Sequence, residues 1–397
     1  MADYLALERN VATVAGAMFL MGLGEELWKR FIPKYLEALG APVLAIGLYG
    51  TARDFLDGVY QYPGGWVADR HGRRTALLLF VCLAMVGYSL YAVAPVWPAI
   101  FAGLAFVMAW SSMASPTLFA VVGDALPPER RTMGFTVQSI LRRVPIVVAP
   151  TLGGVLIAAH GVRGGVRIGL GITIVLSMMT LAVAWRVRIP LVPDATRADM
   201  RAVWRALPLP LRRLLASDIL VRTCEGLVAV FLVLYATRVI GITAVQYGAL
   251  IAVQMTTSIL VYLPAARMAG RLGRKPFVVA TFLAFSLFPV AVVLAKSFAA
   301  LVLAFVVGGL RETGEPARKA LIVDLAVPSL RARSVGLYYL MRSLAITPAA
   351  FVGGVLWSAN PRLPFVAACG FGLIGTAVFC VTVQEQREHG NAGPASR

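Results

Sequence analysis

The chain has 397 residues, of which 59% are hydrophobic and only 14% are charged, and its mean hydropathy is +0.79. Soluble domains carry about 25% charged residues, so this composition excludes an ordinary soluble protein. The formal net charge of +18 would suggest nucleic-acid binding in a soluble chain, and its distribution along the sequence decides whether that reading holds here.

Apolar stretches of about 20 residues, the length that a helix needs to cross a hydrocarbon core of roughly 30 Å, recur along the whole chain. In the first half we expect transmembrane helices at roughly 10–38, 43–66, 74–94, 96–122, 134–158 and 165–186. In the second half we expect them at roughly 214–239, 244–267, 275–296, 298–324, 334–358 and 363–383. The hydropathy pattern therefore predicts twelve membrane spans.

Basic residues concentrate in every second loop. Arg70, Arg73 and Arg74 stand between the second and third spans, whereas the loops at the other side are poor in Lys and Arg. Because cytoplasmic loops carry the excess of Lys and Arg, this pattern places both termini in the cytoplasm. It accounts for the net charge without nucleic acid, and it predicts a multi-pass protein of the plasma (inner) membrane.

The two halves of the sequence repeat at an offset of about 200 residues, as in many transporters. Positions that match in this register include Pro63 and Pro264, Gly72 and Gly273, Arg142 and Arg342, and Gly153-Gly154 and Gly353-Gly354. We therefore expect an all-α membrane protein with two pseudo-symmetric six-helix bundles. Residues 1–190 would form the first bundle, 191–213 a cytoplasmic linker and 214–397 the second bundle.

The loop between the second and third spans reads Gly65-Trp-Val-Ala-Asp69-Arg70-His-Gly72-Arg73-Arg74. It closely resembles the signature loop of the major facilitator superfamily, and the second half repeats it in degenerate form as Gly270-Arg271-Leu-Gly273-Arg274-Lys275. The resemblance implies the twelve-helix fold of that family and transport of a small molecule by alternating access. It implies no enzymatic activity, no cofactor and no metal.

The same resemblance assigns a gating role to the signature loop. In the family, the acid and the Arg of the loop bond to an acid at the end of helix 4, and the matching positions here are Asp69, Arg73 and Asp124. Asp69 would also face the positive N-terminal end of helix 11. The gating set is Gly65, Asp69, Arg70, Gly72, Arg73, Arg74 and Asp124. For its arginines, the positive-inside rule is the simpler alternative.

The fifth span contains Ala149-Pro150-Thr-Leu-Gly153-Gly154, which resembles the kink motif of antiporters in this superfamily. The motif favours antiport, while close packing of small residues is the alternative interpretation. The fourth span lacks the membrane-embedded Arg that many proton antiporters of the family carry.

Ionisable side chains at membrane depth are costly and therefore mark candidate functional sites. The candidates for substrate or proton binding are Glu26, Arg53, Asp54, Asp57, Arg142, Arg222, Glu225, Arg311, Glu312, Glu315 and Arg342. Spacing predicts that Arg53 meets Asp57, that Arg311 meets Glu315 and that Arg222 meets Glu225, each pair on one helix face. Such pairs either serve transport or hold helices together. Asp218 and Arg318 fall nearer the cytoplasmic ends of their helices and are weaker candidates.

The preferred hypothesis is a secondary active transporter that exports a small-molecule substrate in exchange for protons. The alternative is proton-coupled uptake of an anionic or zwitterionic metabolite or peptide, since arginines bind carboxylates bidentately. Glu26-Leu-Trp-Lys29-Arg30-Phe31 also resembles part of the helix 1 motif of proton-coupled peptide transporters. A membrane sensor that does not transport is a third hypothesis. We expect a monomer whose partners are the lipid bilayer, its substrate and protons.

Overall fold

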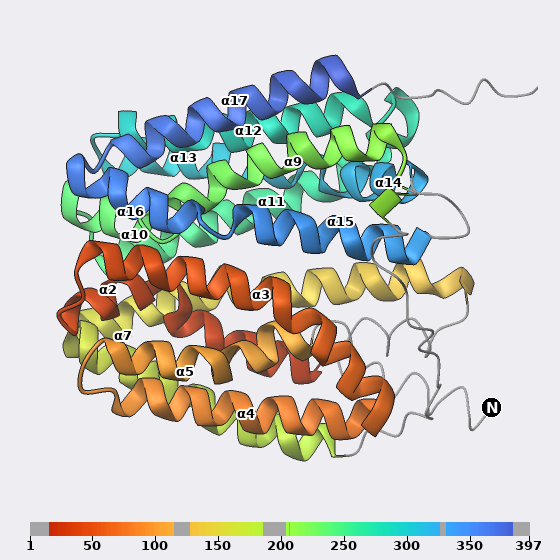
Figure 1. The fold of residues 1–397 in the computed structure, drawn as a ribbon. Helices are drawn as coiled ribbons and strands as arrows, with labels where there is room; N and C mark the ends of the chain where they lie inside the picture. The colour runs from red at the N-terminus through yellow and green to blue at the C-terminus, as the bar shows by residue number, and fades with distance from the viewer. Residues whose placement is uncertain (1–15, 115–127, 186–203, 206, 326–330, 384–397) are drawn as a thin grey trace, which may run out of the picture.

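The computed structural model describes residues 16–114, 128–185, 204–205, 207–325 and 331–383, and within these ranges the chain is helical and has no strand (Figure 1). Residues 16–28 are helical. The first half continues with η1 (Lys29–Phe31), α2 (Ile32–Ala38), α3 (Val43–His71), α4 (Arg73–Val93), α5 (Pro98–Met108), the π-helical turn η2 (Ala109–Met113) and α7 (Pro128–Ala184).

The second half begins with α9 (Leu209–Val228), α10 (Leu232–Leu234), the π-helical turn η3 (Tyr235–Val239) and α11 (Ala244–Leu272). It continues with α12 (Lys275–Leu294), α13 (Phe298–Gly309), η4 (Leu310–Glu312), α14 (Glu315–Leu325), α15 (Arg331–Ile346), α16 (Ala349–Ala359) and α17 (Leu363–Thr382). In Figure 1 the helices of the first half lie together on one side of the molecule and those of the second half on the other.

Each of the twelve predicted spans coincides with helix in the described residues. The fifth and sixth spans form the single element α7, which is broken at Gly161, where φ is 72°. Four spans are interrupted. The first is broken by η1, the seventh by the bend between α9 and α10, the tenth by η4, and the eleventh between α15 and α16. The predicted linker at 191–213 falls mostly outside the described residues.

Apolar length alone does not identify all of these spans. Among the described residues, six helices are long and apolar enough to cross a membrane, and the bent pair formed by Leu209–Val228 and Leu232–Val239 makes a seventh. The second span falls short because α3 carries Arg53, Asp54 and Asp57. The first, fourth and tenth spans fall short because their described helices are shorter than a full span.

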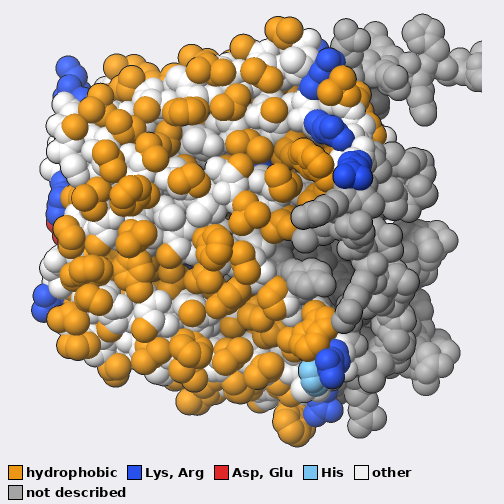
Figure 2. All heavy atoms as spheres, in the orientation of Figure 1, with side chains coloured by type: hydrophobic (Ala, Val, Ile, Leu, Met, Phe, Trp, Pro, Cys, Tyr) orange, Lys and Arg blue, Asp and Glu red, His pale blue; other side chains and the backbone are white. Residues whose placement is uncertain are grey.

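The outer surface is apolar over most of its height. In Figure 2 hydrophobic side chains cover the middle of the visible face, and Lys and Arg side chains gather at its two ends. Leu260, Leu303 and Val381 are each more than two-thirds exposed. An apolar belt of this extent between two charged rims is what a lipid bilayer requires.

The halves pack most closely at one end of the molecule, which carries the turns at Gly40 and Gly241 and is called the sealed end below. There α7 packs along α11, and α3 packs along α16. The contacts follow the sequence repeat: Gly154 lies against the backbone of Ala244, and Gly354 lies against that of Gly47. At Gly154 and Gly47 a Cβ atom would lie within 3 Å of a backbone carbonyl oxygen, so a side chain there would separate the helices.

Two further glycines that match in the sequence repeat, Gly72 and Gly273, each lie at a turn between two helices. Gly72 ends α3 with φ at 84°, and Gly273 ends α11 with φ at 93°. Residues with a side chain rarely adopt this conformation, so each glycine stops one helix and lets the next begin almost at once.

Gly153 provides a test of the packing interpretation of the antiporter-like motif. A Cβ atom on Gly153 would collide with the carbonyl oxygen of Leu27, whereas one on Gly171 would meet no atom within 4 Å. We expect Gly153→Ala to destabilise the protein by about 1 to 3 kcal/mol through overpacking, and Gly171→Ala to be neutral or slightly stabilising. The melting temperatures of the two variants in detergent check this, and equal values would contradict it.

Candidate functional site

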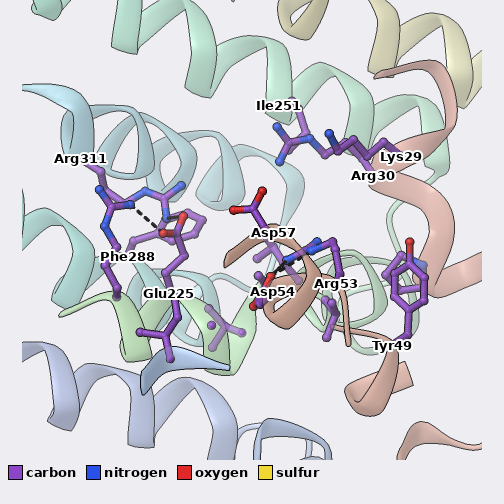
Figure 3. Close-up of a pocket in the computed structure, with 18 of the residues that line it drawn as sticks. Lys29, Arg30, Tyr49, Arg53, Asp54, Asp57, Glu225, Ile251, Phe288 and Arg311 are labelled. Atoms are coloured by element: carbon purple, nitrogen blue, oxygen red, sulfur yellow. Dashed lines mark hydrogen bonds and ion pairs between the residues drawn. The ribbon is translucent and has the colours of Figure 1, made fainter. Parts of the chain in front are cut away.

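A cavity of about 290 Å³ lies between the two halves (Figure 3). Six cationic side chains line it: Lys29, Arg30, Arg53, Arg222, Arg311 and Arg342. Three carboxylates also line it, on Asp54, Asp57 and Glu225. Aromatic and amide side chains, including Tyr49, Tyr247, Gln254 and Phe288, complete the wall. The cavity is therefore lined by ionisable groups from both halves, in a size range suited to a small molecule.

In the first half, the cations of the cavity are paired with nearby carboxylates. Lys29 Nζ lies 3.4 Å from Glu25 Oε2, and Arg30 Nε lies 3.1 Å from Glu26 Oε2. Both glutamates are buried. Tyr88 also donates a hydrogen bond of 2.7 Å to Glu25 Oε1. The predicted candidate Glu26 thus holds Arg30 at the cavity, one helical turn away.

The predicted pairing of Arg53 with Asp57 is wrong. Arg53 Nη2 lies 2.9 Å from Asp54 Oδ1, the carboxylate of the adjacent residue. Asp57 instead accepts a hydrogen bond of 2.6 Å from Ser112 Oγ. Ser112 belongs to the π-helical turn η2, and its bond holds the carboxylate of Asp57 away from Arg53.

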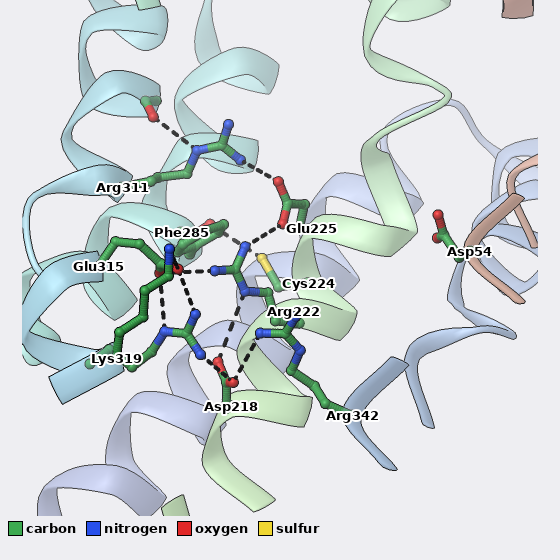
Figure 4. A network of polar contacts seen from close by, with 12 residues as sticks. Asp54, Asp218, Arg222, Cys224, Glu225, Phe285, Arg311, Glu315, Lys319 and Arg342 are labelled. Carbon is green, nitrogen blue, oxygen red and sulfur yellow. Dashed lines mark hydrogen bonds and ion pairs between the residues drawn. The ribbon is translucent and has the colours of Figure 1, made fainter. Parts of the chain in front are cut away.

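In the second half, the fully buried Asp218 is the centre of a network of ion pairs (Figure 4). Its Oδ2 accepts hydrogen bonds from Arg318 Nη1 at 2.6 Å and from Tyr338 at 2.9 Å. Arg342 Nη1 lies 3.4 Å from the same oxygen, and Arg222 Nε lies 3.9 Å from Oδ1. The network therefore ties α9, α14 and α15 together.

Glu315 and Glu225 extend this network toward the cavity. Glu315 pairs with Arg318 at 2.7 Å, with Arg222 at 3.1 Å and with Lys319 at 3.7 Å. Glu225 bridges Arg222 at 3.0 Å and Arg311 at 3.5 Å. The predicted pair of Arg222 and Glu225 is thus confirmed.

The predicted pairing of Arg311 with Glu315 is wrong. Four-residue spacing brings side chains together only on an uninterrupted α-helix. Here the 3₁₀ turn η4 and the following turn separate α13 from α14, so that Arg311 and Glu315 do not share a helix face. Arg311 turns instead to Glu225, with its guanidinium 4.9 Å from the ring centre of Phe285 and 4.8 Å from that of Phe288. Aromatic faces support a desolvated cation in this way.

One ion pair crosses between the halves beside the cavity. Arg143 Nη2 of α7 lies 2.9 Å from Glu312 Oε2 of η4, and the guanidinium lies 4.6 Å from the ring centre of Tyr262. At the sealed end, Arg238 and Glu37 form a second pair across the halves. The predicted candidate Glu312 therefore acts at the interface of the halves and does not line the cavity.

The comparisons with known proteins agree with this architecture. The sequence profile of the Major Facilitator Superfamily matches residues 14–223 and again residues 214–397. These two matches cover almost the whole chain.

The chain belongs to the Major Facilitator Superfamily.

An uncharacterized transporter of this superfamily from Methanocaldococcus jannaschii is 21% identical over 374 residues, which are 91% of each chain. The nucleoside transporter NupG has a similar structure, with a TM-score of 0.77 at 14% identity, over 94% of this chain and all of that one. The human organic anion transporter MFSD10 has a TM-score of 0.69 at 18% identity, over 94% of this chain and 99% of that one. Superfamily membership makes the chain a multi-pass membrane transporter and not an enzyme.

The signature loop of the superfamily lies at the end opposite the sealed end. Arg70 lies 5.1 Å from the ring centre of Trp66, and Arg74 lies 4.7 Å from that of Trp185. Asp124 and the side chains of Asp69, Arg73 and Arg142 lie outside the described residues, as do the surroundings of Gly65. In the second half, Arg274 and Asp324, which correspond in the repeat to Arg73 and Asp124, form an ion pair.

Asp218 and Arg318 were predicted to be weaker candidates than their neighbours. Among the described ion pairs they are nevertheless the most deeply buried, with side chains 0% and 1% exposed. The signal that identifies Asp218 is its spacing: it stands four residues before Arg222 and seven before Glu225, on the same helix face. The position of Asp218 along its helix therefore predicted its importance less well than the helix face on which it lies. Ser112 and Tyr338 had no comparable signal, because each acts through a partner distant in sequence.

Asp218 should be critical for stability. Asp218→Asn leaves Arg318, Arg342 and Arg222 with one carboxylate fewer in a fully buried site, which costs about 3 to 5 kcal/mol for a broken buried pair. The matched control is Asp324→Asn, whose 55% exposed carboxylate pairs with Arg274 and contributes less than about 1 kcal/mol. Melting temperatures in detergent distinguish the two, and an unaltered Asp218→Asn protein would contradict the assignment.

Proposed function

We propose that the chain is a proton-coupled secondary transporter for a small anionic or zwitterionic solute, working by alternating access. The observation that carries this proposal is the cavity between the halves, where arginines of α3, α9, η4 and α15 meet three carboxylates. Guanidinium groups bind carboxylates with geometric selectivity, and a low-dielectric wall strengthens the attraction. The sealed end supports alternating access, because it closes one side of the cavity by direct contact between the halves.

Glu225 is the best-placed carboxylate for proton coupling. It is 37% exposed and holds Arg222 and Arg311, both of which line the cavity. Protonation of Glu225 would release these two guanidinium groups to an anionic group of the solute. Proton and solute then favour each other's binding, which is the linkage that moves both in the same direction.

Efflux by proton antiport is the direction that the sequence favours, through the motif around Gly153. Packing against Leu27 accounts for that glycine, so the motif carries less weight than the linkage at Glu225. The geometry therefore supports the second hypothesis, in which solute and proton move together, and direction is a property to be measured.

The signature loop is proposed to gate the end opposite the sealed end, with both termini in the cytoplasm. The ion pair of Arg274 and Asp324 in the second half supports this role. It is the repeat-related counterpart of the contact expected between Arg73 and Asp124 in the first half. A latch of this kind breaks and reforms as the halves rock.

Proton coupling is tested in proteoliposomes loaded with a pH-sensitive dye, to which 5-aminopentanoate is added, because the neutral form of a simple alkanoic acid would cross the lipid unaided and acidify the lumen. We expect addition of a transported probe to acidify the lumen, and an inward proton gradient to drive probe accumulation. Glu225→Gln should abolish accumulation but retain exchange of labelled for unlabelled probe. Alkalinisation of the lumen on probe entry would instead establish antiport, and binding without any flux would favour a sensor.

Arg342 is expected to contact the anionic group. Arg342 lines the cavity, and its ion pair with Asp218 is long, at 3.4 Å. Arg342→Lys keeps the charge and loses the planar donor pair, so pentanoate affinity should fall about tenfold with little change in melting temperature. Titration of pentanoate into the purified protein measures this. Arg238→Lys at the sealed end is the matched control, and an unchanged affinity in Arg342→Lys would remove Arg342 from the site.

A further inference from the structure

The charges around the cavity are unevenly divided between the halves. In the first half, the three cations Lys29, Arg30 and Arg53 face the four carboxylates Glu25, Glu26, Asp54 and Asp57. In the second half, the four cations Arg222, Arg311, Arg318 and Arg342 face the three carboxylates Asp218, Glu225 and Glu315. Lys319 also pairs with Glu315 at 3.7 Å, so among these described residues the first half has one negative charge in excess and the second half two positive charges. The pair of Arg143 and Glu312, which crosses between the halves, is counted in neither.

Asp57 carries the excess negative charge. Of the three carboxylates that line the cavity, Asp54 is paired with Arg53 and Glu225 with Arg222 and Arg311. For Asp57 the described residues provide no Lys or Arg within 4 Å, only the hydroxyl of Ser112 on one of its oxygens. Figure 3 shows its carboxylate directed into the cavity, away from the pair formed by Arg53 and Asp54.

Arg342 is a weakly held cation of the second half. Its single described ion pair is the 3.4 Å contact with Asp218, an oxygen that Arg318 and Tyr338 already occupy at shorter distances. Its Nε is buried and donates to no described group. The guanidinium of Arg342 lies over the ring of Tyr339, 4.7 Å from the ring centre. Arg342 also lines the cavity.

We propose that the cavity binds a zwitterionic solute in one orientation, with its ammonium group on Asp57 of the first half and its carboxylate on Arg342 of the second. This rests on the proposed transport function and narrows its substrate class. A partly buried charge that is incompletely neutralised is costly, so the ammonium group stabilises the carboxylate of Asp57 and the carboxylate group stabilises the guanidinium of Arg342. A solute that bridges the halves also favours the state in which they lie closer together, and this couples binding to the conformational change.

The test uses three series of probes that differ only in their charged ends. They are the ω-amino alkanoates from glycine to 6-aminohexanoate, the alkanoates of the same length, and the corresponding alkylamines. Affinity is measured by calorimetric titration into the purified full-length protein. We expect one chain length of the amino alkanoates to bind at least tenfold more tightly than either of its singly charged counterparts.

Two variants assign the ends of the solute. Asp57→Asn should reduce the preference for the amino alkanoate over the alkanoate to less than twofold, while alkanoate affinity stays the same or rises. Arg342→Gln should abolish alkanoate binding and retain alkylamine binding. The control Asp54→Asn should keep the preference, because Arg53 already satisfies that carboxylate. Asp57→Glu should shift the preferred chain length downward, and it remains informative if Asp57→Asn fails to fold.

The outcomes separate this inference from the broader function. A preference below twofold at every chain length in the wild type, or one retained in Asp57→Asn, overturns the zwitterion site while alkanoate binding still supports an anion transporter. Failure of both the alkanoates and the amino alkanoates to bind overturns both proposals.

Discussion

Charged side chains in the middle of a lipid-covered helical bundle can lie only where other helices shield them, and they need partners of opposite charge there. In this chain the constraint is met by turning almost all of them to the inside. The outer face is left apolar between two charged rims, and the polar faces of α3, α9 and η4 meet at the cavity. The same constraint that determines the orientation of the helices therefore also creates the binding site.

The two halves meet this constraint in different ways. The first half pairs its three cavity-lining cations locally, within one helical turn or with the adjacent residue, and Asp57 accepts a hydrogen bond from a hydroxyl group. The second half builds one network around the fully buried Asp218, which joins α9, α14 and α15. Pseudo-symmetry of the backbone thus coexists with an asymmetry of charge, and the proposed site between such halves would distinguish the two ends of a zwitterionic ligand.

Small residues and ion pairs divide the task of holding the halves together. At the sealed end, glycines related by the repeat bring helix backbones into contact, which depends only on shape. Beside the cavity, Arg143 and Glu312 cross between the halves through flexible side chains that can separate and pair again. Close packing together with the pair of Arg238 and Glu37 at one end, and the pair of Arg143 and Glu312 beside the cavity, form an arrangement in which rocking about the centre is mechanically feasible.

Hydropathy, loop charge and the repeat at about 200 residues were enough to predict the helical spans and the inward position of most charged residues, because lipid exposure constrains composition along the whole chain. The fold family was predicted from the signature loop at Gly65 to Arg74. Pairing within a continuous helix, as for Arg222 and Glu225, could also be predicted from spacing. What only the tertiary structure decided were contacts that depend on interrupted helices or on distant segments. The 3₁₀ turn at η4 redirects Arg311 to Glu225, the π-helical turn at η2 brings Ser112 to Asp57, and Asp218 meets Arg318 and Tyr338 from other helices. Periodicity carries no information on such contacts, since it assumes an unbroken helix and says nothing of which faces meet.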